Sequence, residues 1–220
     1  MKKVIVFLLL LACAMPIVAQ TTLANDDVYY LRRKTHFDQL KISKKDIVFV
    51  GNSLTDGCEW DELLGNDRIR NRGIVGDIIQ GIIDRIQPVI DGQPKKIFIQ
   101  SGVNDLSHDV TPDSIARAME RLIVMIKTGS PRTKIYLQSL LPFNNDVRLW
   151  KLLKGKEQDV RDANVLLEQV ARRQGVTWIN LYPLFVNSEG KLKPELTNDG
   201  LHLLGTGYLI WRDAIKPYVK

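Results

Sequence analysis

The twelve residues from Asp46 to Gly57, DIVFVGNSLTDG, constrain the fold more than any other stretch of this chain. Ile47 to Val50 form an unbroken apolar run, rich in β-branched residues, which predicts a buried β-strand. The run stops at Gly51, and Ser53 follows two residues later in a polar turn. In an open α/β sheet, ligands bind outside the carboxyl ends of the strands. Ser53 therefore lies at the position where such a fold usually has its functional site. A serine after a strand is, however, also common as a helix cap.

Strands alternate with helices along the rest of the chain. Apolar runs predict further strands at 69–71, 96–100, 134–141 and 176–180, and apolar residues at helical spacing predict helices between them. Thr111-Pro-Asp113 is typical of a helix start. Since no internal repeat or linker interrupts this order, we expect one domain over residues 20–220. The pattern predicts a three-layer α/β fold of the flavodoxin-like type, with a five-stranded parallel sheet in the order 2-1-3-4-5.

The first nineteen residues have the features of a secretory signal. Lys2 and Lys3 precede a continuous apolar run from Val4 to Ala14, and Ala19 offers a small residue before a cleavage point. The run is short for a membrane span. An alternative is that Cys13 accepts a lipid and anchors the chain as a lipoprotein. Either route predicts an exported protein, periplasmic or extracellular.

The charge and cysteine content exclude some classes of protein. Lysine and arginine number 31 against 25 acidic residues, and two of the cations lie in the predicted leader. No basic cluster with interleaved aromatic residues is present, so a nucleic-acid partner is not expected. Apart from Cys13, Cys58 is the one cysteine, so no internal disulfide is expected in the exported chain. Nothing in the sequence specifies the oligomeric state.

Four polar turns are expected to meet at one edge of the sheet. They hold Ser53, Gly73, Asn104, and Asp199 with His202. A serine is a weak nucleophile unless a base takes its proton, and a histidine can do so near neutral pH. Asp199 lies three residues before His202 and can hold the second ring nitrogen of that base.

An acyl-transfer reaction also requires donors for an oxyanion. The Ser53 N–H, the Gly73 N–H and the Asn104 side-chain amide are suitable, because glycine lets the backbone approach a substrate closely. Taken singly, each of these residues could be an ordinary turn residue. Their order and their placement at strand ends together predict a hydrolytic site. No metal-ligating residues surround His202 in the sequence, and neither a metal nor a cofactor is expected.

These residues resemble the sequence blocks of a known family, the SGNH subgroup of GDSL esterases and lipases. The matching blocks are Gly51-Asn-Ser-Leu54, Gly73, Gly102-Val-Asn-Asp105 and Asp199-Gly-Leu-His202. The resemblance implies a flavodoxin-like sheet and a serine esterase mechanism without a metal. It implies a triad of Ser53, Asp199 and His202, and an oxyanion hole formed by Ser53, Gly73 and Asn104. The stretch from Asn71 to Asp77 is most similar to the acetylhydrolase branch, which includes platelet-activating-factor acetylhydrolase subunits and carbohydrate O-acetylesterases.

One residue departs from the pattern of the family. Asn52 occupies a position where the family often has aspartate, which affects local hydrogen bonding around the serine. Other polar residues nearby are expected to have structural roles. Asp105 and His108 could line the site, but a solvated loop is the favoured interpretation, and we expect Asp56 and Asp77 to cap helices or form turns.

The sequence thus predicts an exported serine esterase that removes short acyl groups, acetyl foremost, from a carbohydrate or a similar small ester. An alternative in the same class is a lysophospholipase or another esterase for longer acyl chains. A third interpretation is a binding module on the same fold without catalysis. The expected partner is a small ester molecule, with no stable membrane partner unless Cys13 carries a lipid.

Overall fold

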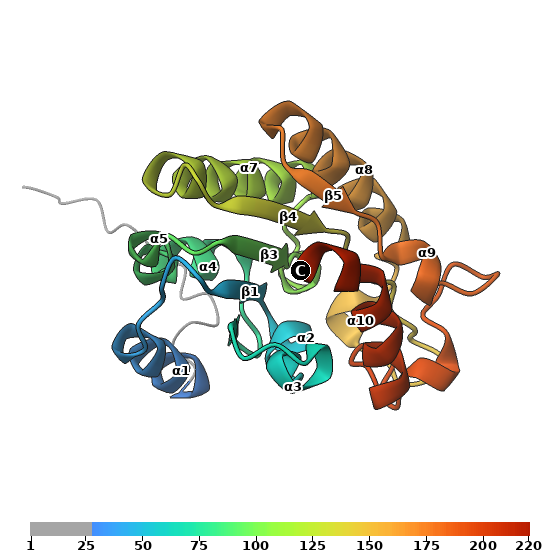
Figure 1. Cartoon of the computed structure of the whole chain (residues 1–220). Coiled ribbons are helices and arrows are strands. Elements are labelled where there is room, and N and C mark those ends of the chain that lie inside the picture. Colours follow the sequence, from blue (N-terminus) through green and yellow to red (C-terminus); the bar gives the residue numbers. More distant parts are fainter. Residues whose placement is uncertain (1–27) are drawn as a thin grey trace, which may run out of the picture.

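The computed structural model of the chain describes residues 28–220, so the predicted leader and Cys13 lie outside the described residues. Five parallel strands form one sheet in the order β2-β1-β3-β4-β5, as the sequence predicted. All strand pairs are parallel, so the five carboxyl ends lie at the same edge of the sheet; β1, β3, β4 and β5 are labelled in Figure 1. The strands are β1 (Ile47–Gly51), β2 (Ile69–Gly73), β3 (Lys96–Gln100), β4 (Lys134–Gln138) and β5 (Thr177–Ile179).

Helices cover both faces of the sheet because successive side chains of a strand point to opposite faces. Val48 and Val50 of β1 pack with the helices of one layer, and Ile47 and Phe49 pack with those of the other. The first layer contains α4 (Ile79–Arg85), α5 (Gln87–Gly92), α6 (Val103–Ser107), α7 (Pro112–Gly129) and α8 (Glu157–Gln174). The second contains α2 (Ser53–Asp56), α3 (Trp60–Leu64), α9 (Tyr182–Phe185) and α10 (Gly205–Val219). The remaining helices are α1 (Val28–Gln39) and the 3-10 turns η2 (Lys151–Leu153) and η3 (Pro194–Leu196).

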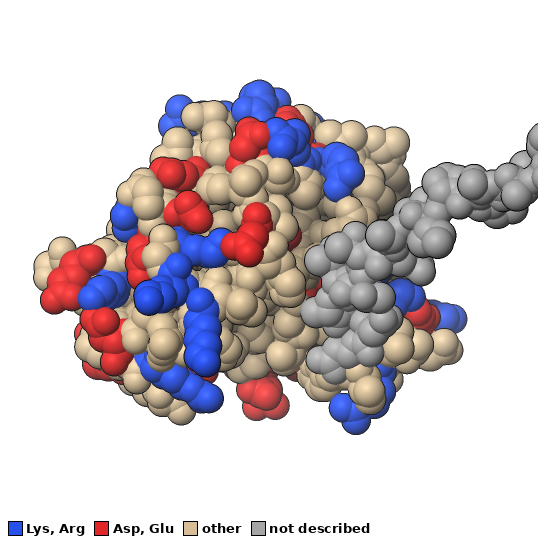
Figure 2. Space-filling model, turned by 180° about the vertical axis from the view of Figure 1, so that it is seen from behind, with Lys and Arg blue, Asp and Glu red and all other residues tan. Residues whose placement is uncertain are grey.

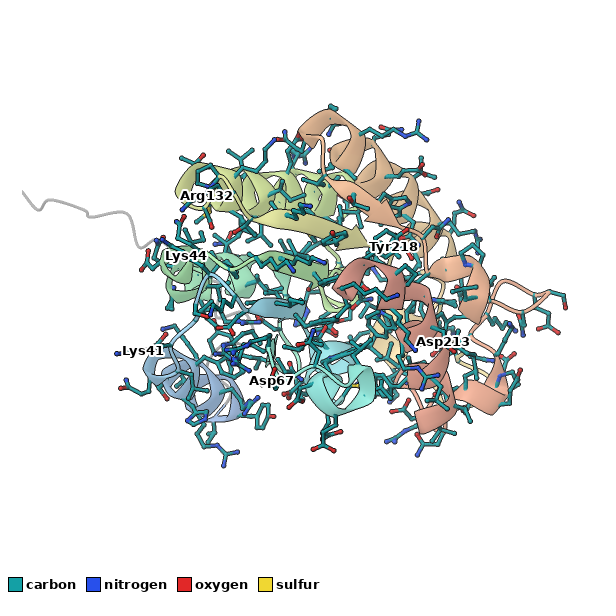
Figure 3. All side chains as sticks on the ribbon, viewed as in Figure 1. Lys41, Lys44, Asp67, Arg132, Asp213 and Tyr218 are labelled. Atoms are coloured by element: carbon teal, nitrogen blue, oxygen red, sulfur yellow. The ribbon has the colours of Figure 1, made fainter. Side chains whose placement is uncertain are left out.

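A row of aromatic rings joins three central strands to the second layer. Phe49, Phe98 and Tyr136 occupy paired positions on β1, β3 and β4, and neighbouring ring centroids lie 4.7 and 4.5 Å apart. Trp60 extends the row at one end, 4.8 Å from Phe49. Tyr218 of α10 extends the other end, 5.5 Å from Tyr136 (Figure 3). Stacked rings of this kind add to the energy of burial and hold the closing helix on the sheet.

One predicted element boundary was wrong. The sequence predicted a strand to Leu141, but β4 ends at Gln138, because the Ser139 hydroxyl accepts the N–H groups of Leu181 and Tyr182 and the chain leaves the sheet. The helix predicted after Asp77 is confirmed as α4, and a second short helix, α5, follows it from Gln87. The start of α7 was predicted correctly, with Thr111 as its hydroxyl cap.

Basic and acidic side chains are intermixed over the rear face of the molecule (Figure 2). No large field of one charge covers this face, which agrees with the charge balance of the sequence. Among the helices of residues 28–220, none is long and apolar enough to cross a membrane.

Candidate active site

Ser53 is the first residue of the short helix α2, directly beyond the carboxyl end of β1. Asn52 caps this helix, since its Oδ1 accepts the Leu54 N–H at 3.1 Å. An aspartate could cap a helix in the same way, so the cap does not explain why asparagine stands here. Its Nδ2 is buried and has no hydrogen-bond partner in the described part of the chain. Ser53, the residue after this cap, lies at the edge of the sheet and is only 9% exposed.

The turn from Thr197 to His202 holds the other two predicted residues. Asp199 Oδ1 accepts the backbone N–H groups of Leu201 and His202, at 2.9 and 2.8 Å. Gly200 has a φ of +82°, which favours glycine, and a β-carbon there would lie 2.1 Å from the Asn144 carbonyl oxygen. The turn therefore closes tightly, and the second oxygen of Asp199 is left facing the imidazole of His202.

Ser53, His202 and Asp199 form one continuous chain of hydrogen bonds. His202 Nδ1 lies 2.7 Å from Asp199 Oδ2, and His202 Nε2 lies 2.9 Å from Ser53 Oγ. Burial opposes ionisation of Asp199, but hydrogen bonds from the ring of His202 and from two backbone N–H groups lower its pKa below the ordinary value. An ionised Asp199 fixes the proton on Nδ1 and leaves Nε2 free to accept the serine proton.

Asn104 lies on α6 beyond the end of β3, the strand that pairs with β1, but Gly73 has a different environment from the one predicted. The Gly73 N–H already donates to Asn71 Oδ1 at 2.7 Å. A β-carbon at position 73 would lie 2.2 Å from the backbone nitrogen of Asp56. The assignment of Gly73 as an oxyanion donor is therefore corrected: this glycine permits close packing of β2 against α2, and its N–H is not free.

Gly76 is a backbone donor that the sequence reasoning missed. It lies in the turn between β2 and α4, has a φ of +77°, and a β-carbon there would meet no atom within 4 Å. Within residues 28–220 its N–H enters no hydrogen bond. Asn104 Nδ2 donates to the carbonyl of the next residue, Asp77, at 2.9 Å, which places the Asn104 amide beside this turn. The sequence did contain a signal for this donor, because Gly76 is the second glycine of the Asn71–Asp77 stretch.

Asn71 ties the end of the serine helix to the sheet. Its Nδ2 lies within hydrogen-bonding distance of the carbonyl oxygens of Thr55, Asp56 and Cys58, at 2.8, 3.2 and 3.0 Å. The last carbonyl groups of a helix have no partner within the helix itself. Asn71 therefore fixes the position of α2 relative to β2.

Arg85 joins the two strand ends below the site. Its guanidinium donates to the carbonyl oxygens of Gly51 and Arg72, at 3.1 and 2.9 Å, and to Asp77 Oδ2 at 2.7 Å. Both members of the Arg85–Asp77 ion pair are buried. Burial raises the pKa of Asp77, and the guanidinium acts against that shift.

Asp77 closes a turn, one of its two predicted roles, because its N–H donates to the Ile74 carbonyl oxygen at 3.2 Å, whereas Asp105 does not have its predicted role. The cap position of α4 is Ile78, and Asp77 accepts the Ile78 N–H besides pairing with Arg85. Asp105 is buried, not solvated, and both its oxygens accept the Ile79 N–H, at 3.2 and 3.3 Å. Burial raises the pKa of Asp105 to about 6.

Asp56 and His108 lie at the margins of the site. Asp56 does not cap a helix; its carboxylate accepts the Tyr29 hydroxyl at 2.6 Å and pairs with Arg33 at 3.3 Å, which fastens α1 to α2. His108 is exposed, as predicted, and its Nδ1 lies 2.7 Å from the Asn104 carbonyl oxygen.

Trp150 is the second residue that the sequence reasoning missed. Its indole Nε1–H donates to the Asp199 carbonyl oxygen at 2.7 Å, and its ring meets the His202 ring edge to face at 5.7 Å. Its own backbone N–H donates to Asn145 Oδ1 at 2.8 Å. Asn144 supports the same turn by donating its N–H to the Gly200 carbonyl. The segment after β4 therefore braces the turn that carries Asp199 and His202.

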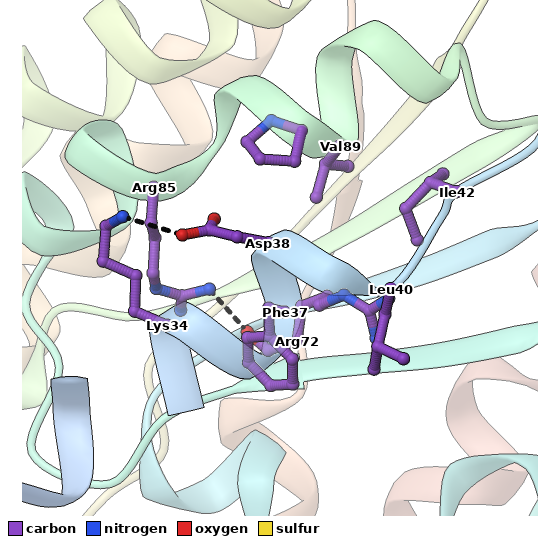
Figure 4. Close-up of a pocket in the computed structure, with 9 residues that line it drawn as sticks. Lys34, Phe37, Asp38, Leu40, Ile42, Arg72, Arg85 and Val89 are labelled. Carbon is purple, nitrogen blue, oxygen red and sulfur yellow. Dashed lines mark hydrogen bonds and ion pairs between the residues drawn. The ribbon is translucent and has the colours of Figure 1, made fainter. Parts of the chain in front are cut away.

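A small cavity under α1 is separate from this cluster. Its volume is about 10 Å³, room for one water molecule. Figure 4 shows Lys34 paired with Asp38, and Arg85 bonded to the Arg72 carbonyl, in its wall. None of the lining residues belongs to the Ser53–His202–Asp199 chain. Among the described residues, no group of three or more His, Cys, Asp or Glu side chains is arranged to hold a metal ion.

Comparison with protein families decides the class of the molecule. The model of the GDSL-like lipase/acylhydrolase family matches residues 49–210, which include Ser53, Asn104, Asp199 and His202. The chain belongs to this family. As a GDSL-like acylhydrolase, it is a carboxylic ester hydrolase.

Several known proteins are similar to this acylhydrolase. Platelet-activating factor acetylhydrolase IB subunit alpha2 of Homo sapiens is 26% identical over 201 residues, covering 86% of this chain and 82% of the relative. A GDSL-like lipase of Bacteroides thetaiotaomicron has a solved structure with a TM-score of 0.75 at 25% identity, covering 86% and 96% of the two chains. A variant of an acetyl-xylooligosaccharide esterase of Geobacillus stearmophilus, at 18% identity, shares the fold, with a TM-score of 0.64 and coverage of 79% and 93%.

Proposed function

We propose that this acylhydrolase is an exported serine esterase that removes short acyl groups, acetyl foremost, from small esters such as acetylated carbohydrates. One observation carries the proposal: Ser53 Oγ, the imidazole of His202 and the Asp199 carboxylate are joined by contacts of 2.9 and 2.7 Å. This is the arrangement by which a serine is activated at neutral pH. The acetyl preference draws on the acetylhydrolase and acetyl-xylooligosaccharide esterase among the similar proteins.

The reaction proceeds through an acyl-enzyme. Ser53 Oγ attacks the carbonyl carbon of the ester while its proton passes to His202 Nε2. The tetrahedral intermediate collapses, the bond to the leaving oxygen breaks, and His202 gives the proton to that oxygen. A water molecule then attacks the acyl-enzyme, with His202 as base, and releases the acid and free Ser53. Asp199 orients the imidazole and stabilises its protonated form throughout.

The oxyanion of the intermediate needs preorganised donors. Ser53 N–H stands in the first turn of α2 and enters no hydrogen bond within residues 28–220. Asn104 uses one hydrogen of its amide on the Asp77 carbonyl and keeps the other. We assign the third donor to the Gly76 N–H in place of that of Gly73, because the Gly73 N–H is bonded to Asn71.

A comparison of substrates tests this function. p-Nitrophenyl acetate should be hydrolysed with a higher kcat/KM than the butyrate, octanoate and palmitate esters, and a fluorophosphonate should label Ser53. A preference for long acyl chains or for lysophospholipids would replace the acetyl proposal while keeping the mechanism. If the Ser53→Ala variant kept both its activity and its labelling by the fluorophosphonate, the mechanism itself would be contradicted.

A further inference from the structure

The segment from Val147 to Lys156, which follows β4, has an unusual composition for an exposed loop. Its ten residues, VRLWKLLKGK, contain four cations, five large apolar residues and no acidic residue. The segment is gold in Figure 1 and contains the 3-10 turn η2. It also contributes Trp150, which touches His202.

The segment has an inner and an outer side. Trp150 and Leu153 face inward: the indole bonds to the Asp199 carbonyl, and Leu153 is buried in the core. Leu149 and Leu152 are 54% and 65% exposed, and Val147 before them is 37% exposed. The inner contacts therefore fix an outer side on which the apolar residues face solvent.

The outer side is also cationic. Lys156 is paired with Asp109, but Arg148, Lys151 and Lys154 form no ion pair within residues 28–220. Arg148 lies over the Trp150 ring, 5.8 Å from its centroid. Single exposed leucines are normal on protein surfaces, whereas several together among unpaired cations indicate a surface with a partner.

We propose that this outer side, formed by Val147, Arg148, Leu149, Lys151, Leu152 and Lys154, docks on the surface of an anionic lipid bilayer. Leucine side chains beside lysine and arginine match the boundary between acyl chains and headgroups. Unpaired cations are attracted to anionic headgroups. A neutral polysaccharide would use neither the cations nor the exposed aliphatic carbons. Because Trp150 joins this surface to His202, docking brings the active site next to lipid.

The proposal does not depend on the reaction catalysed, and its test needs no hydrolysis. In the full chain with Cys13→Ala, a Leu152→Cys variant is labelled with the environment-sensitive dye NBD. Cys58 does not compete, because it is buried and burial raises the pKa of its thiol to about 12. The matched control carries the dye at Val165→Cys, an exposed aliphatic position on α8.

Vesicles of phosphatidylcholine containing about 30% phosphatidylglycerol should shift the emission of the dye at position 152 to the blue, with a rise in intensity. The same dye at position 165 should not respond, and vesicles of phosphatidylcholine alone should give at most a weak response. Adding Lys151→Glu and Lys154→Glu should raise the lipid concentration for half-maximal response by roughly tenfold or more.

The dye reports the segment itself, and the dye at position 165 of the same chain controls for binding through the N-terminal residues. An unchanged spectrum at position 152 would overturn the proposal. So would equal responses at 152 and 165, or equal responses to neutral and anionic vesicles. A response at 152 to acetylated xylan but not to vesicles would also overturn it and would assign the surface to carbohydrate.

Discussion

The indole N–H of Trp150 donates to the backbone carbonyl of Asp199 at 2.7 Å, although 49 residues separate the two in the sequence. The same ring contacts His202, so one side chain supports both residues of the turn that faces Ser53. Trp150 acts on the reaction through its neighbours and is a positioning residue. Reactions of this kind are sensitive to displacements of about 1 Å in the reacting groups.

Replacing Trp150 by phenylalanine should separate the two contacts. Trp150→Phe keeps a ring against His202 but loses the N–H, and a hydrogen bond contributes about 0.5–1.5 kcal/mol, so kcat should fall by roughly two- to tenfold. Trp150→Ala removes both contacts and should lower kcat further, with KM changed less. Steady-state kinetics on p-nitrophenyl acetate would measure this, with Trp178→Phe on β5 as the matched control. Equal activity of Trp150→Ala and the parent would exclude the positioning role.

Loss of the Asn104 side-chain amide should affect the chemical step. Asn104→Ala should lower kcat by roughly 10²–10³, the usual cost of removing one oxyanion donor. The fold should persist, because Asn104 is half-buried in a short helix and loses only one hydrogen bond within the described residues, to the Asp77 carbonyl. Kinetics and thermal melting of the same preparation would check both points. A rise in KM with unchanged kcat would mean that Asn104 positions substrate instead.

Gly73 at the end of β2 and Gly76 in the turn after it should respond differently to an oxyanion mimic. A phosphonate adduct on Ser53 places a negative oxygen where the intermediate would carry it. In the NMR spectrum, the Gly76 amide proton should move downfield on adduct formation, since it gains a hydrogen bond to a charged oxygen. The Gly73 amide proton should move much less, because it remains bonded to Asn71. The opposite pattern would restore Gly73 as the donor.

Burial of Asp105 makes the free energy of unfolding depend on pH. Its pKa is raised to about 6 in the folded protein, against about 3.9 in an unfolded chain, so the folded state binds more protons between these values. Its contribution to stability is therefore highest below pH 4 and is lost as pH rises to about 6, by about 1.4 kcal/mol for each pKa unit. Asp105→Asn should remove this slope.

Urea unfolding at a series of pH values would measure the effect of Asp105→Asn. Asp67→Asn, at a strongly exposed carboxylate, is the matched control and should leave the slope unchanged. If Asp105→Asn kept the full fall in stability between pH 4 and 6, the slope would belong to other groups, such as Asp77, whose pKa burial also raises.

The sequence was sufficient for the strand order and for the residues that meet at the sheet edge. Ser53, Asn104 and the Asp199–His202 turn each follow a recognisable strand end or have a distinctive spacing, and a parallel sheet brings such ends together. Gly73 and Gly76 could not be separated in this way. Gly73 ends β2 and Gly76 lies in the turn that follows, and only the direction of each N–H distinguishes a bonded amide from a free one.

Residues that act through tertiary contacts could not be predicted from the sequence, for a different reason. Trp150 lies in a loop with no periodic pattern, and its role depends on a turn far along the chain. Asp105 lies in a polar stretch whose composition is typical of a solvated turn, yet its side chain is buried against the start of α4. Hydrophobic periodicity predicts which helices and strands exist. It does not predict which polar side chain of one loop forms hydrogen bonds with the backbone of another loop.

The most direct test of the account is the comparison of Ser53→Ala, His202→Ala and the double variant with the parent enzyme. The two residues are joined by a 2.9 Å contact and act as one unit, so each single change should lower kcat on p-nitrophenyl acetate by several orders of magnitude. The double variant should be about as slow as either single one. Melting temperatures should stay near that of the parent. If Ser53→Ala kept activity within about tenfold of the parent, or if the two losses multiplied, the hydrogen-bonded chain from Ser53 to Asp199 would not be the catalytic centre.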